Sequence, residues 1–162
     1  MKDKAGFTLL ELLVVIGILA VAAAVSLPNL SGWQGKRNLK NDFDRLSSYL
    51  GTVKVEAIAR NTKTKLELHS YGADHKLTGS WKNGGKWEAF KDIDGTLEKT
   101  TVAGPVDLEF SPDGSVSSCN GVQTCQYTVS SDHGRYRATV HLATGFLEKE
   151  KYDPKTKTWS EI

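Results

Sequence analysis

Residues 7–30 read FTLLELLVVIGILAVAAAVSLPNL, and this stretch decides how the chain is organised. Glu11 is its only ionisable side chain, and its length matches the roughly 20 residues that a helix needs to cross a bilayer. Lys2 and Lys4 precede it, so the positive-inside rule places the first residues in the cytoplasm and the rest on the far side. In a bacterium that side is the periplasm. We therefore expect a single-pass inner-membrane helix over residues 7–30 and a periplasmic globular domain over residues 31–162.

The overall charge excludes one class of function. Lys and Arg together number 21 and Asp and Glu 19, which gives a net charge of +2 at pH 7. The chain is therefore not a bulk electrostatic binder of nucleic acid, and such binding would need a local patch. Residues 31–162 approach the usual size of an independently folding domain, so they can bury a core of their own.

Glu11 is a functional candidate because a carboxylate within a membrane helix costs roughly 2.5–3.5 kcal/mol on insertion scales. A cation should therefore pair with it. Cleavage between Gly6 and Phe7 would create an α-amino group four residues before Glu11. The same amine on a neighbouring subunit could also supply the charge.

The sequence GFTLLE at residues 6–11, with a short basic leader before it and an apolar helix after it, resembles the type IV prepilin cleavage and methylation motif. The resemblance implies that a prepilin peptidase cuts after Gly6 and that Phe7 becomes N-methylated. It also implies that Glu11 guides each subunit into register with the one already in the filament. Pro28 lies where pilin helices often carry a kink, and it removes an intrahelical hydrogen bond.

A cleaved secretory signal is the alternative interpretation of this segment. The small residues Ala22, Ala23, Ala24 and Ser26 could imitate a signal-peptidase site. This alternative predicts a mature chain that starts near Val25 or Ser26. The apolar run is, however, too long for a typical signal-peptide core.

A second helix is predicted over residues 33–60, after an interruption at Ser31 and Gly32. Apolar residues recur there at alternating spacings of four and three, which is typical of one helical stripe. The stripe consists of Leu39, Phe43, Leu46, Leu50, Val53 and Ala57. Charged side chains on the opposite face indicate that the stripe packs against a sheet. With one bend, the two segments could form a single helix over about 7–60.

Strand-like patterns follow over residues 64–162. The candidates are residues 65–71, 76–82, 86–93, 106–110, 125–131 and 135–142. Turn signals separate them, as at Asn83-Gly84-Gly85. We therefore expect an α+β fold in which a long N-terminal helix packs on a mostly antiparallel β-sheet.

The order of these features resembles the GspH/FimT family of minor pilins and pseudopilins. LEFSPDG at residues 108–114, two further strands, and Thr144-Gly145-Phe146 carry this second resemblance. It implies a subunit in the tip or the initiating part of a type II secretion pseudopilus or a type IV pilus, and it does not distinguish the two machines. The implied partners are other pilin subunits, the prepilin peptidase and the inner membrane.

The two cysteines, Cys119 and Cys125, enclose a short loop in a compartment that we expect to be oxidising, so we predict a disulfide between them. The histidines show no zinc-type spacing, and Asp92-Ile93-Asp94-Gly95 lacks the ligand spacing of a calcium loop. We expect neither a metal nor a cofactor.

Arg135 and Arg137 alternate with Tyr136, which places both guanidinium groups on one face of a strand. Two such groups could grip DNA phosphates, and FimT-type pilins that bind DNA during transformation carry a similar Gly-Arg-x-Arg motif. In the family that motif follows the final strand turn, where this chain has Glu148. A solvated strand face is the alternative. No nucleophile elbow, P-loop or HExxH is present in the sequence, so we expect a structural subunit and not an enzyme.

Overall fold

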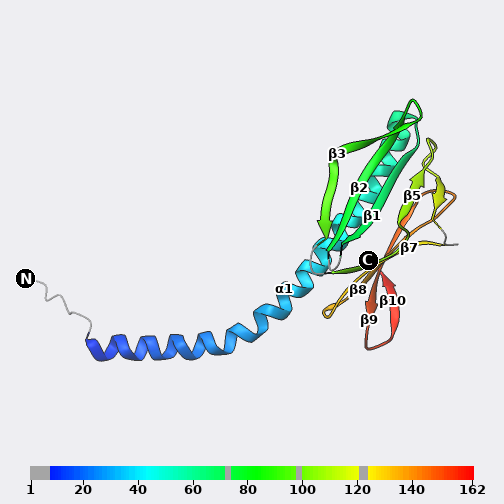
Figure 1. Cartoon of the computed structure of the whole chain (residues 1–162). Coiled ribbons are helices and arrows are strands. Elements are labelled where there is room, and N and C mark those ends of the chain that lie inside the picture. Colours follow the sequence, from blue (N-terminus) through cyan, green and yellow to red (C-terminus); the bar gives the residue numbers. More distant parts are fainter. Residues whose placement is uncertain (1–7, 72–73, 98–99, 121–123) are drawn as a thin grey trace, which may run out of the picture. The chain divides into compact units, whose positions relative to one another are not determined.

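The computed structural model of the chain describes residues 8–71, 74–97, 100–120 and 124–162 (Figure 1). Side-chain positions are described for these residues except 23–31, 71 and 94. The chain divides into two compact units, Met1–Gln34 and Gly35–Ile162.

One helix, α1 (Leu9–Arg60), passes through both units. The expected interruption at Ser31 and Gly32 is wrong, because one glycine costs a helix only about 1 kcal/mol and leaves its backbone hydrogen bonds in place. The helix ends at a Schellman motif. Asn61 adopts a left-handed φ of 50°, its N–H donates to Ile58 O, and the N–H of Thr62 donates to Ala57 O.

The predicted apolar stripe of α1 forms the core of the second unit. Each of its side chains is at most 1% exposed. These residues are Leu39, Phe43, Leu46, Leu50, Val53 and Ala57. The Phe43 ring stacks on Tyr136 with centroids 5.0 Å apart, and Thr64 Oγ1 donates a hydrogen bond to Val53 O at 2.8 Å. This prediction is confirmed, because a helix buries one stripe when it packs on a sheet.

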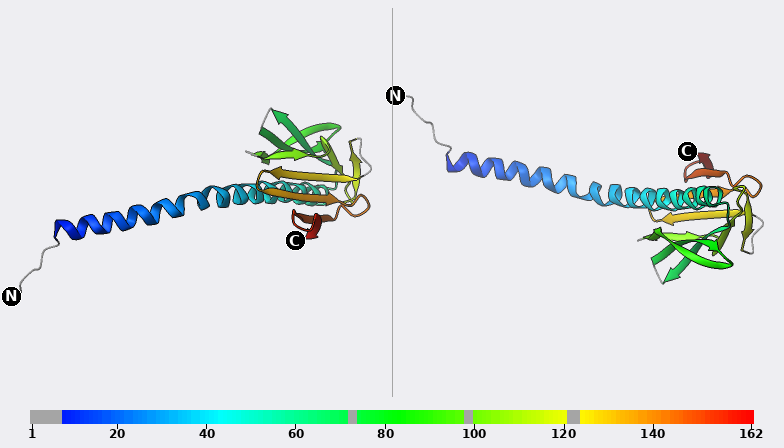
Figure 2. Two further views of the ribbon diagram at one scale, coloured as in Figure 1. Left: turned by 90° about the horizontal axis from the view of Figure 1, so that it is seen from below. Right: turned by 90° about the horizontal axis from the view of Figure 1, so that it is seen from above.

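Two five-stranded sheets pack around this helix (Figure 2). Sheet A has the spatial order β3 (Lys86–Leu97), β2 (Asp74–Asn83), β1 (Thr64–Tyr71), β5 (Asp107–Phe110) and β6 (Val116–Cys119). Sheet B has the order β10 (Thr158–Glu161), β9 (Leu147–Asp153), β8 (Gly134–Val140), β7 (Cys125–Ser131) and β4 (Thr101–Ala103). Neighbouring strands of the described residues all pair antiparallel. The expected α+β class and antiparallel pairing are confirmed.

Two details of the strand prediction are wrong. The strands form two sheets and not one, because apolar alternation identifies a strand but does not say which strand it pairs with. Four strands were also missed, namely β4, β6, β9 and β10. The first two are short. β9 reads LEKEKYD and is paired through ladder hydrogen bonds and cross-strand charges instead of an apolar face.

Candidate functional site

The first described turn of α1 is closed by a reciprocal cap. Glu11 Oε2 accepts hydrogen bonds from the Thr8 N–H at 3.1 Å and from Thr8 Oγ1 at 3.2 Å. The backbone N–H of Glu11 in turn donates to Thr8 Oγ1 at 3.2 Å. This is a capping box, in which two side chains satisfy backbone donors that a helix N-terminus leaves open. Gly6 and Phe7, the predicted processing residues, lie outside the described residues.

The helix that follows this cap is apolar on every side. The large side chains at residues 9–21 are between 45% exposed, at Val15, and 78% exposed, at Leu9. A helix with this character normally lies buried in a larger core, in a helix bundle or in lipid. A Cβ at Gly17 would meet no atom within 4 Å, so this glycine leaves an open notch on the helix surface.

Within the described residues, no helix has both the length and the apolar character needed to cross a membrane. The expected membrane span over residues 7–30 is not supported by this finding. The backbone of α1 is continuous through Pro28, and the kink expected there stays a prediction.

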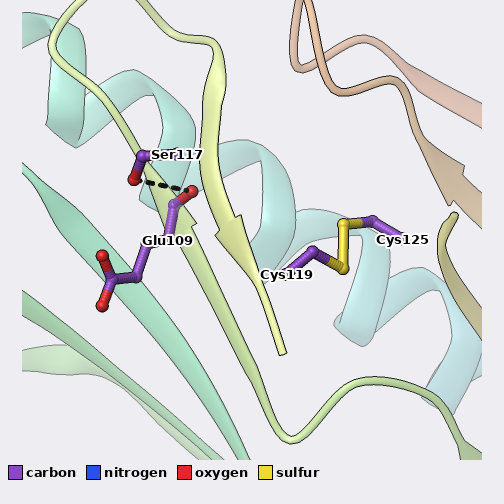
Figure 3. The surroundings of a disulfide bond; sticks show 4 residues. All are labelled: Glu109, Ser117, Cys119 and Cys125. Atoms are coloured by element: carbon purple, nitrogen blue, oxygen red, sulfur yellow. Dashed lines mark hydrogen bonds between the residues drawn. A yellow bond between two sulfur atoms is a disulfide. The ribbon is translucent and has the colours of Figure 1, made fainter. Parts of the chain in front are cut away.

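A disulfide joins Cys119 to Cys125, as expected (Figure 3). Their Cα atoms lie 5.9 Å apart. Cys119 ends β6 at one edge of sheet A, whereas Cys125 begins β7 inside sheet B. The bond therefore connects the two sheets. Beside it, Ser117 Oγ donates to Glu109 O at 3.4 Å, which adds a contact between β6 and β5.

Arg135 and Arg137 lie on the face of β8 opposite the buried Tyr136, as the alternation predicts. Arg137 Nε donates to Glu150 Oε2 at 2.7 Å, and the guanidinium carbon lies 4.2 Å from the Trp159 ring centroid. The guanidinium carbon of Arg135 lies 5.7 Å from the centroid of the Tyr152 ring. Both arginines thus contact β9 or β10, two of the four strands that the sequence analysis does not predict.

The described residues contain no group of three or more His, Cys, Asp or Glu side chains placed to hold a metal ion. Thr8 is the site residue that sequence reasoning missed. Its signal was the Thr-x-x-Glu spacing of Thr8 and Glu11, which is the sequence signature of a capping box.

Residues 1–27 match a family model described as the prokaryotic N-terminal methylation motif. The match supports a type IV pilin-like protein, which a prepilin peptidase processes and which assembles with other pilins. No curated protein matches the chain. No solved structure matches it either.

Proposed function

We propose that this chain is a minor pilin or pseudopilin of the GspH/FimT type, in a type II secretion pseudopilus or a type IV pilus. It is held in the inner membrane before assembly, with its globular domain in the periplasm. It serves as a substrate of processing enzymes and not as an enzyme. The main observation that supports the proposal is that the methylation-motif match overlaps a helix with exposed apolar side chains. The large apolar side chains at residues 9–21 of this helix are exposed in the single chain.

The proposed mechanism is assembly by burial of this helix. In the membrane this apolar surface already lies in lipid, so close van der Waals packing beside equivalent helices, and not removal from water, favours the filament. Glu11 gives the packing a register. Its carboxylate would need a positive partner in an apolar surrounding, and the new N-terminal amine of a neighbouring subunit provides one.

The first experiment determines the intact mass and the N-terminal peptide of the protein purified from its native membrane. We expect a chain that begins with N-methylated Phe7. A chain that begins near Ser26, or that retains Met1, would overturn the proposal.

A Glu11→Ala variant tests the assembly step. It should insert into the membrane at least as well as the parent chain, because an apolar residue replaces the carboxylate. Its incorporation into filaments should nevertheless be lost. Normal incorporation of this variant would refute the role of Glu11 in registration.

A DNA-binding minor pilin is the second candidate. It is supported by the common outward face of Arg135 and Arg137, although the Glu150 carboxylate already pairs with Arg137. This role predicts binding to duplex DNA that weakens steeply with salt and is lost in the double variant Arg135→Ala, Arg137→Ala. If the double variant binds as tightly as the parent chain, the arginines are not the contact.

A further inference from the structure

A groove of about 280 Å³ lies between the last turns of α1 and strands β2 and β3. Thr52, Glu56 and Arg60 line it from the helix, and Trp81 lines it from β2. Its remaining wall is residues 89–93 of β3. Figure 1 shows the end of α1 and the β2–β3 turn at the same end of the domain. All of these residues belong to the second compact unit.

An irregularity in β3 builds the outer wall. Thr78 pairs with Asp94 and Ser80 pairs with Ala89, so residues 90–93 of β3 stand opposite Gly79 alone. Such a bulge redirects side chains away from regular alternation. Phe90 and Ile93 are consequently buried, at 8% and 2% exposure, while the two residues between them are exposed.

Arg60 is held in a fixed orientation inside this groove. Its guanidinium carbon lies 4.6 Å from the Trp81 ring centroid and 5.4 Å from that of Phe90. Its Nε donates to Glu56 Oε2 at 2.5 Å. Nε–H is one of five donors on a guanidinium, and the Arg60 side chain is 44% exposed. The terminal amino groups can therefore reach a carboxylate that arrives from solvent, in the bidentate geometry that arginine favours.

The segments around the groove carry an excess of positive charge. Residues 56–63 and 82–92 together contain five basic and three acidic side chains. Two of the three carboxylates already have partners, because Glu56 binds Arg60 and Glu88 accepts a hydrogen bond from Asn83 Nδ2 at 2.8 Å. Of the basic residues, Arg60 binds Glu56, and Lys63 Nζ lies 3.9 Å from Glu109 Oε2. The positive charge that favours a negatively charged partner therefore comes from Lys82, Lys86 and Lys91.

The size of the groove is compatible with one side chain of a partner. Its volume of about 280 Å³ lies close to the lower end of the roughly 300–1,000 Å³ range of small-molecule sites. We propose that the groove binds an acidic segment of another protein. A glutamate or aspartate carboxylate would pair with Arg60, and apolar atoms of the segment would pack on Trp81 and Phe90. The inference concerns the globular domain and does not depend on the N-terminal helix.

Calorimetric titration of the full chain in detergent, with a synthetic peptide of alternating glutamate and tyrosine, tests the proposal. We expect Arg60→Gln to weaken binding at least tenfold. Arg60→Lys keeps the charge but loses the planar fork, so its affinity should be intermediate. Lys40→Gln is the control, because Lys40 forms a similar i,i+4 ion pair with Asp44 on the same helix. It should leave the affinity within a factor of two.

Four results would overturn the proposal. They are an unchanged affinity in Arg60→Gln, equal binding of an alternating lysine and tyrosine peptide, tighter binding of oligothymidylate than of the acidic peptide, and no binding at millimolar peptide. The third result would assign the groove to nucleic acid. Circular dichroism establishes that each variant is folded, and the Arg60 Nε–H resonance in NMR spectra reports whether the peptide reaches this side chain.

Discussion

Glu11 Oε2 and Thr8 hold each other at the start of α1, with the carboxylate accepting from both the N–H and the Oγ1 of Thr8. The carboxylate that we propose to align subunits therefore also caps its own helix. These two roles use different properties of the side chain. Capping needs a hydrogen-bond acceptor, whereas pairing with an amine across subunits needs a negative charge.

Glu11→Gln separates the two roles. Glutamine also serves in capping boxes, so the helix should begin at the same residue, whereas Glu11→Ala should lose about 0.3–1.5 kcal/mol of helix stability. Both variants lack the charge, and both should fail to enter filaments. Filament yield measured by shearing and immunoblotting checks the prediction. Assembly of Glu11→Gln at the parent level would show that the charge is not needed.

Phe43→Ala should destabilise the globular domain by about 3–5 kcal/mol, because it leaves a cavity where a fully buried ring stacks on Tyr136. Phe146→Ala is the matched control, since that ring is 57% exposed. The control should change the free energy of unfolding by no more than about 0.5 kcal/mol. Urea denaturation followed by circular dichroism measures both values. Equal losses in the two variants would argue against the described core.

Removal of the disulfide by Cys119→Ala with Cys125→Ala should lower the free energy of unfolding by about 2 kcal/mol, as expected for a short closed loop. Because the bond connects β6 of sheet A to β7 of sheet B, exchange of the backbone amides should also rise in β6 and at the start of β7. Addition of a reductant to the parent chain should reproduce both effects. A reductant without effect on stability would contradict the prediction.

Tyr127 should limit stability at alkaline pH. Burial, together with the Asp107 carboxylate, raises the pKa of the Tyr127 hydroxyl above its ordinary value. The unfolded chain ionises this group near pH 10 and the folded chain does not, so its contribution to stability is complete below about pH 10 and is lost at higher pH.

Tyr127→Phe should flatten this alkaline decline. At neutral pH it should change the free energy of unfolding by no more than about 1 kcal/mol, because the buried hydroxyl has no hydrogen-bond partner among the described residues. Unfolding midpoints in urea between pH 7 and pH 11 check both statements. The hydroxyl would be shown to have a structural role if Tyr127→Phe lost more than about 2 kcal/mol at pH 7.

The parts of this fold that follow an apolar period could be predicted from sequence. The stripe from Leu39 to Ala57 was predicted residue by residue, because burial against a sheet requires that spacing. The alternation around Tyr136 was similarly informative. The division into two sheets was not predictable, since it depends on pairings such as Thr64 with both Trp81 and Phe110, which lie far apart in the chain.

Some features of the candidate site could likewise be predicted from the sequence, and others could not. The Cys119–Cys125 bond could be predicted from the number of cysteines and the expected compartment, but its place between two sheets could not. The partners of Arg137 were hidden because Glu150 and Trp159 lie on strands without an apolar pattern. The charged sequence around Glu150 shows no apolar alternation and is not among the predicted strands, whereas its register with β8 makes it a strand.

The pairing of β9 with β8 restricts which substitutions the sequence can accept during evolution. Arg137 and Glu150 face each other across β8 and β9, and their side chains are only 23% and 15% exposed. Replacement of either residue alone leaves a charge without its counterpart in a half-buried place. We therefore expect related sequences to exchange these two positions together, so that covariation, rather than invariance of either residue, marks this strand pair.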